Sequence, residues 1–333
     1  MPTTSVLMVV LDEEEHLERA AESVLAQSED DLELLVIDGG STDGTRDIVG
    51  DLRARDPRVR ALDNPARIIP AGLNVGLAAA RGRYVARLDG HSQWKPDVLE
   101  RGVALLEAWP GVAAVGGRRL GVGDGRTGRG IAAALSSRLG VGNSIYHYGE
   151  EPAATDHATC GVYRTDVARA VGGWDEDLPV NEDVDFDHRI RDRGWGIRFD
   201  PQMETHWQVQ PDVGRLFRQY RRYGRGKSEM IRKNGWRALR ARHCAPPALV
   251  LTVAGALVAG GASRRWAALS PIAAYGASLS GAALMTRRRT LDDTFGVFLL
   301  ALSAMHFGWG VGFLESHVLG TRPHGTSRVG VAP

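Results

Sequence analysis

The sequence predicts an α/β domain with a mostly parallel sheet, followed by a basic segment and by helices long enough to cross a membrane. Apolar runs alternate with amphipathic stretches from residue 5 to residue 116, charge is distributed unevenly, and three spans near the C-terminus are almost uncharged. These observations predict four regions: an α/β domain over 1–211, a basic amphipathic interfacial segment over 212–243, a membrane region over 244–316 and a polar tail over 317–333.

The composition excludes several classes of protein. Hydrophobic residues make up 43% of the 333 residues and charged residues 24%, which are values of a folded chain rather than a disordered one. Cys160 and Cys244 cannot form a disulfide framework, and no Cys/His cluster has the spacing of a zinc site. A fold stabilised by disulfides or zinc is therefore excluded.

The α/β pattern begins with an apolar run at 5–11, typical of a strand that is buried on both faces. A helix is expected over 14–27, because its apolar residues form one stripe. Further strands are expected at 32–37, 58–62, 84–88 and 112–116, and further helices at 42–55, 71–80 and 96–108. This alternation predicts a mostly parallel sheet whose ligands bind beyond the carboxyl ends of the strands.

Carboxylates, rather than glycines, follow three of these strands. Asp12, Asp38 and Asp89 occupy such positions, and no glycine-rich dinucleotide motif follows the first strand. A carboxylate can accept hydrogen bonds from a base or a ribose, or hold a divalent cation that binds phosphates. Asp89 and His91 could together offer an oxygen and an imidazole nitrogen to Mg²⁺ or Mn²⁺, although a solvated turn is the alternative.

A second acidic cluster lies later in the same domain. Four carboxylates occur within six residues, at Glu182, Asp183, Asp185 and Asp187. Their mutual repulsion should raise the pKa of at least one of them, as a general base requires. The alternative is a helix N-terminus whose acids are favoured by the helix dipole, and it suits Asp185 and Asp187 better than the first two.

Charge divides the chain into an acidic and a basic part. Residues 1–211 contain 23 Lys and Arg against 35 Asp and Glu, whereas residues 212–243 contain 11 against 2. A basic segment of this kind would bind nucleic acid or an anionic membrane. We expect a membrane and no nucleic acid, because apolar spans follow the basic segment directly and the acidic domain would repel phosphates.

Three expected membrane helices, 245–263, 266–286 and 294–314, contain no Asp, Glu, Lys or Arg. Each would be about 28–32 Å long, close to the ~30 Å hydrocarbon core. A soluble bundle is one alternative, and two spans with a helix on the lipid surface are another.

Arginines at the ends of these spans predict their orientation. Arg237, Arg240 and Arg242 precede the first span, and Arg287, Arg288 and Arg289 follow the second. Both clusters lie on the cytoplasmic side if all three spans cross. The apolar stretch at 6–11 is too short for a signal peptide. We therefore expect a multi-pass protein of the cell (inner or plasma) membrane with a cytoplasmic α/β domain.

Five motifs, in this order, resemble the inverting nucleotide-sugar glycosyltransferases of family 2, which have the GT-A fold. The resemblance covers about residues 4–227. It is carried by the strand and helix at 5–27, the nucleoside-binding turn LLVIDGGSTDGT at 34–45, Asp89-Gly90-His91 at the D-x-D metal motif, Asn181-Glu182-Asp183 at the catalytic acidic pair, and Gln219-Tyr220-Arg221-Arg222-Tyr223 at the Q-x-x-R-W signature.

Within that family, the stretches at 64–76, 140–148 and 219–226 are most similar to exopolysaccharide enzymes of the succinoglycan type. The chain departs from the family pattern at three positions. Val9 replaces a common proline, Asp12 a common asparagine, and Gly39 the second aspartate of D-D-G-S. The contacts with the donor base are the ones that these changes affect.

The resemblance implies a role for each motif residue. Asp38, with Glu13 or Asp12, would bind the uracil and ribose of a UDP-sugar, and Arg67 would bind its diphosphate. Asp89 and His91 would hold a divalent cation, Mn²⁺ or Mg²⁺. Asp183, paired with Glu182, would take the proton from the acceptor hydroxyl. Gln219, Arg222 and Tyr223 would lie on the acceptor and diphosphate side.

Other residues receive weaker interpretations. Arg225, Lys227, Arg232 and Lys233 would lie against lipid headgroups or a lipid pyrophosphate, with a solvated face as an equal alternative. Cys160, His147, His157 and the pair His206-Trp207 are interpreted as structural rather than catalytic.

The resulting hypothesis is a membrane-anchored, metal-dependent, inverting hexosyltransferase that acts on a lipid-linked or polysaccharide acceptor in exopolysaccharide or cell-envelope glycan synthesis. UDP is the expected nucleotide, with GDP and dTDP as alternatives. A polyprenyl-phosphate glycosyltransferase that primes the lipid carrier is the alternative enzyme, and three spans are too few for a processive synthase with its own pore. A degenerate membrane scaffold is the non-enzymatic alternative. The oligomeric state is not determined by the sequence.

Overall fold

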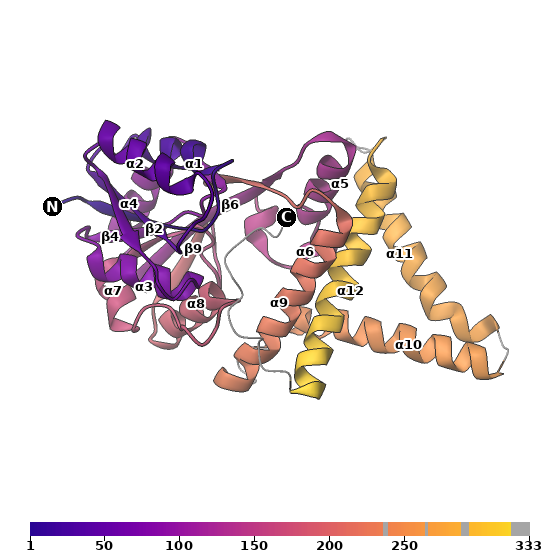
Figure 1. Ribbon diagram of the computed structural model, residues 1–333. Coiled ribbons are helices and arrows are strands. Elements are labelled where there is room, and N and C mark those ends of the chain that lie inside the picture. The colour runs from indigo at the N-terminus through magenta and orange to yellow at the C-terminus, as the bar shows by residue number, and fades with distance from the viewer. Residues whose placement is uncertain (236–238, 264–265, 288–292, 321–333) are drawn as a thin grey trace. The chain divides into compact units, whose positions relative to one another are not determined.

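The computed structural model describes residues 1–235, 239–263, 266–287 and 293–320 (Figure 1). The chain divides into two compact units. The first comprises Met1–Leu120 and Tyr148–Trp207, and the second comprises Gly121–His147 and the described residues from Gln208 onward. The segment Gly121–His147, which lies inside the expected 1–211 region, thus belongs to the second unit.

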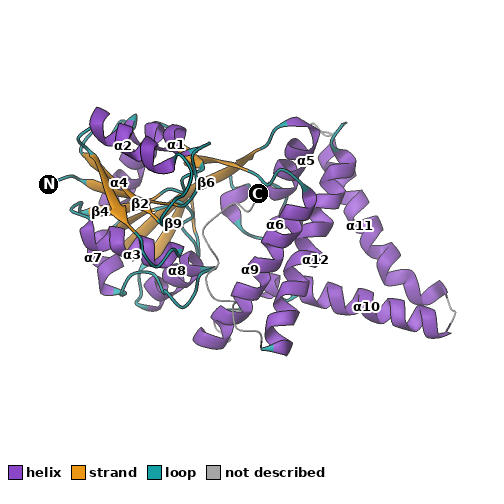
Figure 2. Cartoon of the chain, viewed as in Figure 1, coloured by secondary structure: helices purple, strands orange, loops and turns teal. Residues whose placement is uncertain are grey.

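A mixed sheet forms the centre of the first unit (Figure 2). Its described strands are β1 (Thr4–Val10), β2 (Leu32–Asp38), β3 (Val59–Asp63), β4 (Tyr84–Arg87), β5 (Ser92–Trp94), β6 (Val112–Val122), β7 (Ala153–Ala154), β8 (Val162–Arg164) and β9 (Gly196–Gln208). They follow the order β3-β2-β1-β4-β8-β6-β9-β5, and β7 pairs with β9. The pairs among the first four strands are parallel, and β8 joins β4 to β6 in antiparallel pairs. The predicted α/β class is confirmed, although the strand expected at 112–116 extends to Val122.

Helices cover both faces of this sheet (Figure 1). One face is covered by α1 (Leu17–Leu25), α2 (Thr45–Arg55) and α4 (Val98–Ala108), and the other by α3 (Ile69–Ala79), α7 (Thr165–Ala170) and α8 (Glu182–Asp192). On β1, Val6 and Met8 belong to one hydrophobic cluster and Leu7 to the other, because successive side chains of a strand point to opposite faces. Burial on both faces explains the uninterrupted apolar run of this strand.

The register of the parallel strands determines where the polar residues lie. Val10 is opposite Asp38 in the β1–β2 pair, and Leu7 is opposite Arg87 in the β1–β4 pair. The loops that follow β1, β2 and β4 therefore leave the sheet at the same edge. This edge holds the three carboxylates that follow the strands, Asp12, Asp38 and Asp89.

The second unit is helical. Its helices are α5 (Gly125–Leu135), α6 (Arg138–Val141), α9 (Val213–Asn234), α10 (Ala245–Ser263), α11 (Ser270–Arg287) and α12 (Phe295–Leu319), and 3-10 turns occur at Ile145–His147, Ala241–His243 and Trp266–Leu269. Small residues allow α9 and α12 to pack closely. A Cβ atom on Gly312 would lie 2.0 Å from the Arg221 carbonyl oxygen, and one on Gly224 would lie 2.0 Å from that of Trp309. This contact needs glycine on both helices.

The basic segment is the helix α9, and part of its charge is used inside the second unit. Arg221 and Arg225 both pair with Glu315 of α12 at 2.7 Å, and Arg232 donates to Ser316. Lys227 is buried. We expected Arg225, Lys227 and Arg232 to face lipid or solvent. Lys227 instead lies in the packing of α9. Arg225 and Arg232 stay partly or fully exposed while they contact Glu315 and Ser316, because the opposing helix carries a carboxylate and a hydroxyl at matching positions.

Two described helices are long and apolar enough to cross a membrane, Ala245–Ala262 and Phe295–Val318. The third expected span, 266–286, forms a 3-10 turn and α11, and α11 is not one of these two. Arg237, Arg288 and Arg289, on which the expected orientation depends, lie outside the described residues, as does most of the expected tail at 317–333.

Candidate active site

Two turns at the edge of the sheet are joined by hydrogen bonds from side chains to backbone. Asp12, which has a positive φ of 54°, accepts from the Thr42 N–H at 2.7 Å, and its own N–H donates to the Ser41 hydroxyl at 2.9 Å. Asp38 accepts from the Ser41 hydroxyl at 2.5 Å and from Arg46 at 2.7 Å. Burial alone would raise the pKa of Asp38, but these hydrogen bonds outweigh it and lower the pKa. Asp38 is therefore a fixed, ionised acceptor.

Arg67 lies beside the same turns. Its backbone has a positive φ of 59°, and its guanidinium donates to the Gly40 carbonyl oxygen at 3.0 Å. Gly40 also has a positive φ, of 83°, which glycine adopts readily. Arg67 thus places a cation beside Gly40, which follows Asp38 by two residues in the chain. An anionic group of a ligand could be bound there.

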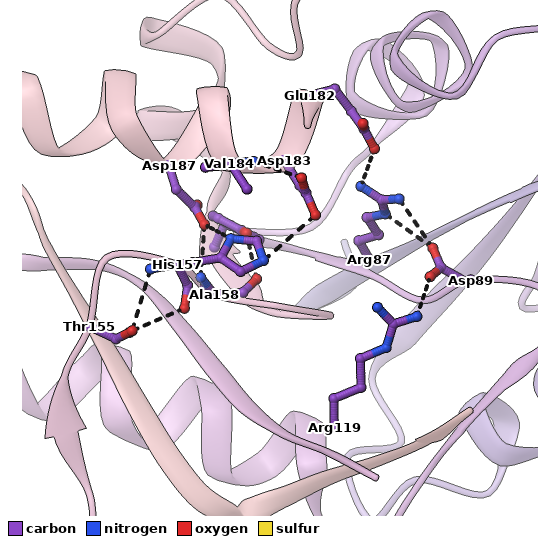
Figure 3. Close-up of polar contacts among 11 residues, drawn as sticks. Arg87, Asp89, Arg119, Thr155, His157, Ala158, Glu182, Asp183, Val184 and Asp187 are labelled. Carbon is purple, nitrogen blue, oxygen red and sulfur yellow. Dashed lines mark hydrogen bonds and ion pairs between the residues drawn. The ribbon is translucent and has the colours of Figure 1, made fainter. Parts of the chain in front are cut away.

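The loop after β4 brings Asp89 and His91 to this edge, and each has a partner of opposite charge. Glu13 Oε1 lies 3.0 Å from His91 Nδ1. Asp89 pairs with Arg87 at 3.2 Å and with Arg119 at 3.5 Å (Figure 3). Burial alone would raise the pKa of Asp89, but the two guanidinium groups hold it well below its usual range. Burial alone would lower the pKa of His91, but the bond to Glu13 raises it.

Arg87 connects Asp89 to the second acidic cluster. Its Nη1 atom lies 2.9 Å from Oε1 of Glu182, while its other nitrogens face Asp89 (Figure 3). Glu182 is the first residue of α8 and its side chain is only 7% exposed. Burial raises the pKa of Glu182 to about 7, and the neighbouring Asp183 adds to the shift. The expected pKa increase within the acidic cluster thus falls on Glu182.

Asp183 differs from Glu182 in its exposure. Its side chain is 35% exposed, and Oδ1 accepts from the Val184 N–H at 2.7 Å. Asn181, just before the helix, has a left-handed backbone with φ of 63°, which turns the chain sharply into α8. The two adjacent acids therefore differ in access: Glu182 points to Arg87 in the interior, and Asp183 remains open to a ligand.

His157 lies next to Asp183. Its Nε2 atom is 3.6 Å from Asp183 Oδ2, and its Nδ1 atom is 2.6 Å from Asp187 Oδ2 (Figure 3). His157 is therefore not isolated, because the fold brings it between two acids of α8, and its interpretation as structural rather than catalytic stays a prediction. Nothing in the local sequence around His157 indicates this contact.

The remaining candidates, Gln219, Arg222 and Tyr223, lie on α9 in the second unit. The Gln219 side-chain amide donates to the Tyr223 hydroxyl at 3.0 Å, one helical turn away. The rings of Tyr220 and Tyr223 contact each other edge to face. The other candidates, from Asp12 to Asp183, all belong to the first unit.

A family profile identifies the chain. The profile described as Glycosyl transferase family 2 matches residues 5–172, about half of the chain and most of the first unit. The chain belongs to glycosyl transferase family 2. Over 94% of its length this glycosyltransferase is 31% identical to the succinoglycan biosynthesis protein ExoA of Rhizobium meliloti, and the match covers 95% of that relative.

Two further proteins are similar over most of the chain at lower identity. A dolichyl N-acetyl-alpha-D-glucosaminyl phosphate 3-beta-D-2,3-diacetamido-2,3-dideoxy-beta-D-glucuronosyltransferase of Methanococcus voltae is 23% identical, with 69% of this chain and 74% of the relative covered. The solved mannosyltransferase PcManGT of Pyrobaculum calidifontis, in complex with GDP-Man and Mn²⁺, has a TM-score of 0.63 and 22% identity, with 91% of this chain and 87% of that chain covered. This likeness confirms the GT-A fold.

The ligands that this glycosyltransferase offers suit a cation that is bound together with its substrate. Asp89 offers a carboxylate, and His91 offers Nε2 because its Nδ1 faces Glu13. Carboxylate and imidazole both suit Mn²⁺, and carboxylate suits Mg²⁺. Among the described residues no group of three or more His, Cys, Asp or Glu could hold a metal ion. The donor's phosphates and water would therefore have to complete the coordination.

Sequence reasoning about this family 2 glycosyltransferase missed two residues of the network, Arg87 and Arg119, and favoured a structural role for two others, His157 and Asp187. Arg87 could have been noticed, since it lies two residues before Asp89. The Arg119 guanidinium lies 4.3 Å from the centre of the Trp207 ring while it faces Asp89, so the contact with Trp207 helps to hold Arg119 in place.

The interpretation of Cys160 as a non-catalytic residue is consistent with its surroundings. Cys160 is buried, and burial raises the pKa of its thiol to about 11, which leaves it protonated at neutral pH.

Proposed function

We propose that this family 2 glycosyltransferase is anchored in the cell membrane and transfers a hexose, with inversion, from a UDP-sugar to a lipid-linked or polysaccharide acceptor. The observation that carries the proposal is that the first unit combines two features. Asp183 is an accessible acid, and Asp89 and His91 lie at the carboxyl edge of the sheet. ExoA, whose name assigns it to succinoglycan biosynthesis, supports exopolysaccharide synthesis. The Methanococcus relative, named for action on a dolichyl-linked sugar, supports a lipid-linked acceptor.

The donor would bind at the turns after β1 and β2. Asp38 is held ionised, so it can accept from the N–H of a uracil ring or from a ribose hydroxyl. Asp12 is more exposed, and Arg67 adds positive charge for the diphosphate. Asp89 and His91 would hold a divalent cation, which stabilises the negative charge that develops on the departing diphosphate.

Asp183 is better suited than Glu182 to act as the base. Glu182 is buried and bound by Arg87. Because its pKa is about 7, Glu182 is protonated in about half of the molecules at neutral pH. Asp183 takes the proton of the acceptor hydroxyl while that oxygen bonds to the anomeric carbon. The bond from this carbon to the diphosphate oxygen breaks in the same displacement, so an α-linked donor gives a β-glycoside. One carboxylate is enough, because the diphosphate leaves without being protonated.

Membrane anchoring would bring the enzyme to its acceptor. The two apolar helices at Ala245–Ala262 and Phe295–Val318 support a multi-pass anchor. The arginines at the ends of the expected spans are the reason to place the first unit in the cytoplasm. Exposed apolar side chains on α10, namely Leu251, Leu257 and Val258, are suited to contact with lipid. The residues Gln219, Arg222 and Tyr223 on α9 would contribute to the acceptor and diphosphate side.

Nucleotide release tests the proposal directly. Membranes that contain the enzyme would be offered UDP-, GDP- and dTDP-sugars with and without Mn²⁺, beside the variants Asp183→Asn and Asp89→Ala. We expect release from one donor only, dependent on metal and reduced by at least about 100-fold in Asp183→Asn. Turnover that persists in Asp183→Asn would favour transfer to a polyprenyl phosphate, which needs no base. Absence of donor binding would favour a membrane scaffold.

A further inference from the structure

A chain of contacts links the core of the first unit to Asp183 (Figure 3). Asp187 is completely buried, and its Oδ2 atom accepts from the Ala158 N–H at 2.8 Å and lies 2.6 Å from His157 Nδ1. The other ring nitrogen, Nε2, is 3.6 Å from Asp183 Oδ2. Asp183 and Asp187 are four residues apart on α8 and so share one face of the helix. The imidazole ring lies between them.

We propose that His157 is a positioning residue for the catalytic base: anchored by Asp187, it orients the Asp183 carboxylate and keeps it ionised between turnovers. This inference rests on the proposed role of Asp183.

The acids around His157 favour its protonated form. A carboxylate that is fully removed from water is strongly destabilised unless a cation or several hydrogen bonds compensate it. The imidazole is in direct contact with this carboxylate and is itself buried. Burial alone would lower the pKa of His157, but Asp183, Asp187 and Asp156 outweigh it and raise the pKa.

The other ionisable groups nearby do not reverse this balance. From β8, Tyr163 donates its hydroxyl to the Ala158 carbonyl oxygen at 2.8 Å, and burial raises its pKa, so it stays neutral. Glu182 and Arg87 lie on the other side of Asp183 and pair with each other at 2.9 Å. The cation that faces Asp183 Oδ2 is therefore His157.

Both oxygens of Asp183 then have a fixed neighbour. Oδ1 accepts from the Val184 N–H, and Oδ2 faces the imidazolium. A side chain that is 35% exposed would otherwise sample several rotamers, most of them directed to solvent. A cation within about 4 Å also favours the ionised form of the carboxylate, which is the form that accepts a proton. His157 thus contributes both to the orientation of the base and to the stability of its ionised form, beside the Val184 N–H and Arg87.

The test compares His157→Gln and Asp187→Asn with a matched control, His188→Gln, in the full-length enzyme. His188 is also buried, lies on α8 and pairs with an aspartate, Asp192, at 3.5 Å, but it does not touch Asp183. Glutamine and asparagine retain hydrogen-bonding groups of similar reach, and thermal unfolding would check that each variant is folded. Nucleotide release would be measured against pH and donor concentration.

We expect His157→Gln and Asp187→Asn to lower kcat on the order of 10- to 100-fold, with the donor KM within about twofold of wild type, since misplacement of the base affects the chemical step. The acidic limb of the kcat–pH profile should move up by about one pH unit, because the carboxylate loses its cation. His188→Gln should behave as wild type in both respects.

Two results would overturn the inference: an unchanged acidic limb in both variants, or a rise in the donor KM at constant kcat. Asp183→Asn, measured beside them, separates this inference from the proposed function. If Asp183→Asn keeps its turnover, the proposed base itself is wrong. If Asp183→Asn is inactive while His157→Gln is fully active, the base stands and the positioning role of His157 is wrong.

Discussion

Replacement of Glu182 by glutamine should stabilise the protein at neutral and alkaline pH but not in acid. The Glu182 side chain is buried beside Asp183, and its Oε1 atom accepts from Arg87 Nη1 at 2.9 Å. Glutamine retains an oxygen that can accept the same hydrogen bond, and Arg87 keeps its pair with Asp89. The substitution therefore removes mainly the charge.

The size and sign of the effect follow from the pKa of Glu182. Its ordinary value is 4.5 and its value in the folded protein is about 7. Between these pH values the folded protein retains a proton on Glu182 that the unfolded chain has lost. The free energy of unfolding therefore falls as the pH rises from 4.5 to 7: the protonated Glu182 contributes its full stabilisation below pH 4.5, and this contribution is lost as the pH passes through 7. The full shift corresponds to about 3 kcal/mol, part of which belongs to the repulsion between Glu182 and Asp183.

Thermal unfolding of the full-length protein in detergent, followed by tryptophan fluorescence from pH 4 to pH 8, would measure this effect. The difference in Tm between Glu182→Gln and wild type should become more positive between pH 4 and pH 8. The full shift corresponds to a change of about 6–12 °C in this difference. Glu22→Gln, an exposed position on α1, is the control and should show no such trend. A Tm difference between Glu182→Gln and wild type that does not change with pH would refute the reasoning, because ionised Glu182 would then not destabilise the folded protein.

Three further predictions concern the donor site, the metal site and the core. Asp38→Asn should raise the donor KM on the order of 10-fold in steady-state kinetics, because the ionised acceptor that Ser41 and Arg46 hold in place is lost; an unchanged KM would place the nucleoside elsewhere. Glu13→Gln should raise the Mn²⁺ concentration needed for half-maximal nucleotide release about 10- to 100-fold, because His91 loses the partner that fixes its ring, whereas an unaltered metal requirement would contradict His91 as a ligand. Gly117→Ala should lower stability by about 1–3 kcal/mol or more, because a Cβ atom there would lie 1.6 Å from the Met203 carbonyl oxygen, while Gly111→Ala, with no atom within 4 Å of its Cβ, should match wild type in thermal unfolding.

The sequence was sufficient for the α/β class, for most elements of the first unit and for the motif residues at the strand ends. The run at 5–11 became β1 (Thr4–Val10), and the expected helix at 71–80 became α3 (Ile69–Ala79). These features depend on the periodicity of neighbouring residues, which can be read directly from the chain. The catalytic and ligand-binding roles of the motif residues stay predictions.

The second unit shows where sequence reasoning was incomplete. The helix α5 and its packing with α12 were not expected. The stretch Gly121–His147 lies between strands of the first unit in the sequence, and the order of the chain does not indicate that it belongs to the second unit. The basic residues of α9 were interpreted by composition alone. Their pairing with Glu315 depends on a helix that lies about 90 residues further along the chain.

The sequence by itself determined which acids stand at the sheet edge, because strand ends and motif spacing are local properties. The tertiary structure alone decided how these acids differ. Arg87 binds Glu182, 95 residues away, and His157 lies between Asp183 and Asp187, 30 residues from the latter. Burial raises the pKa of Glu182 and pairing lowers that of Asp89, and both effects depend on side chains that only the folded chain brings together.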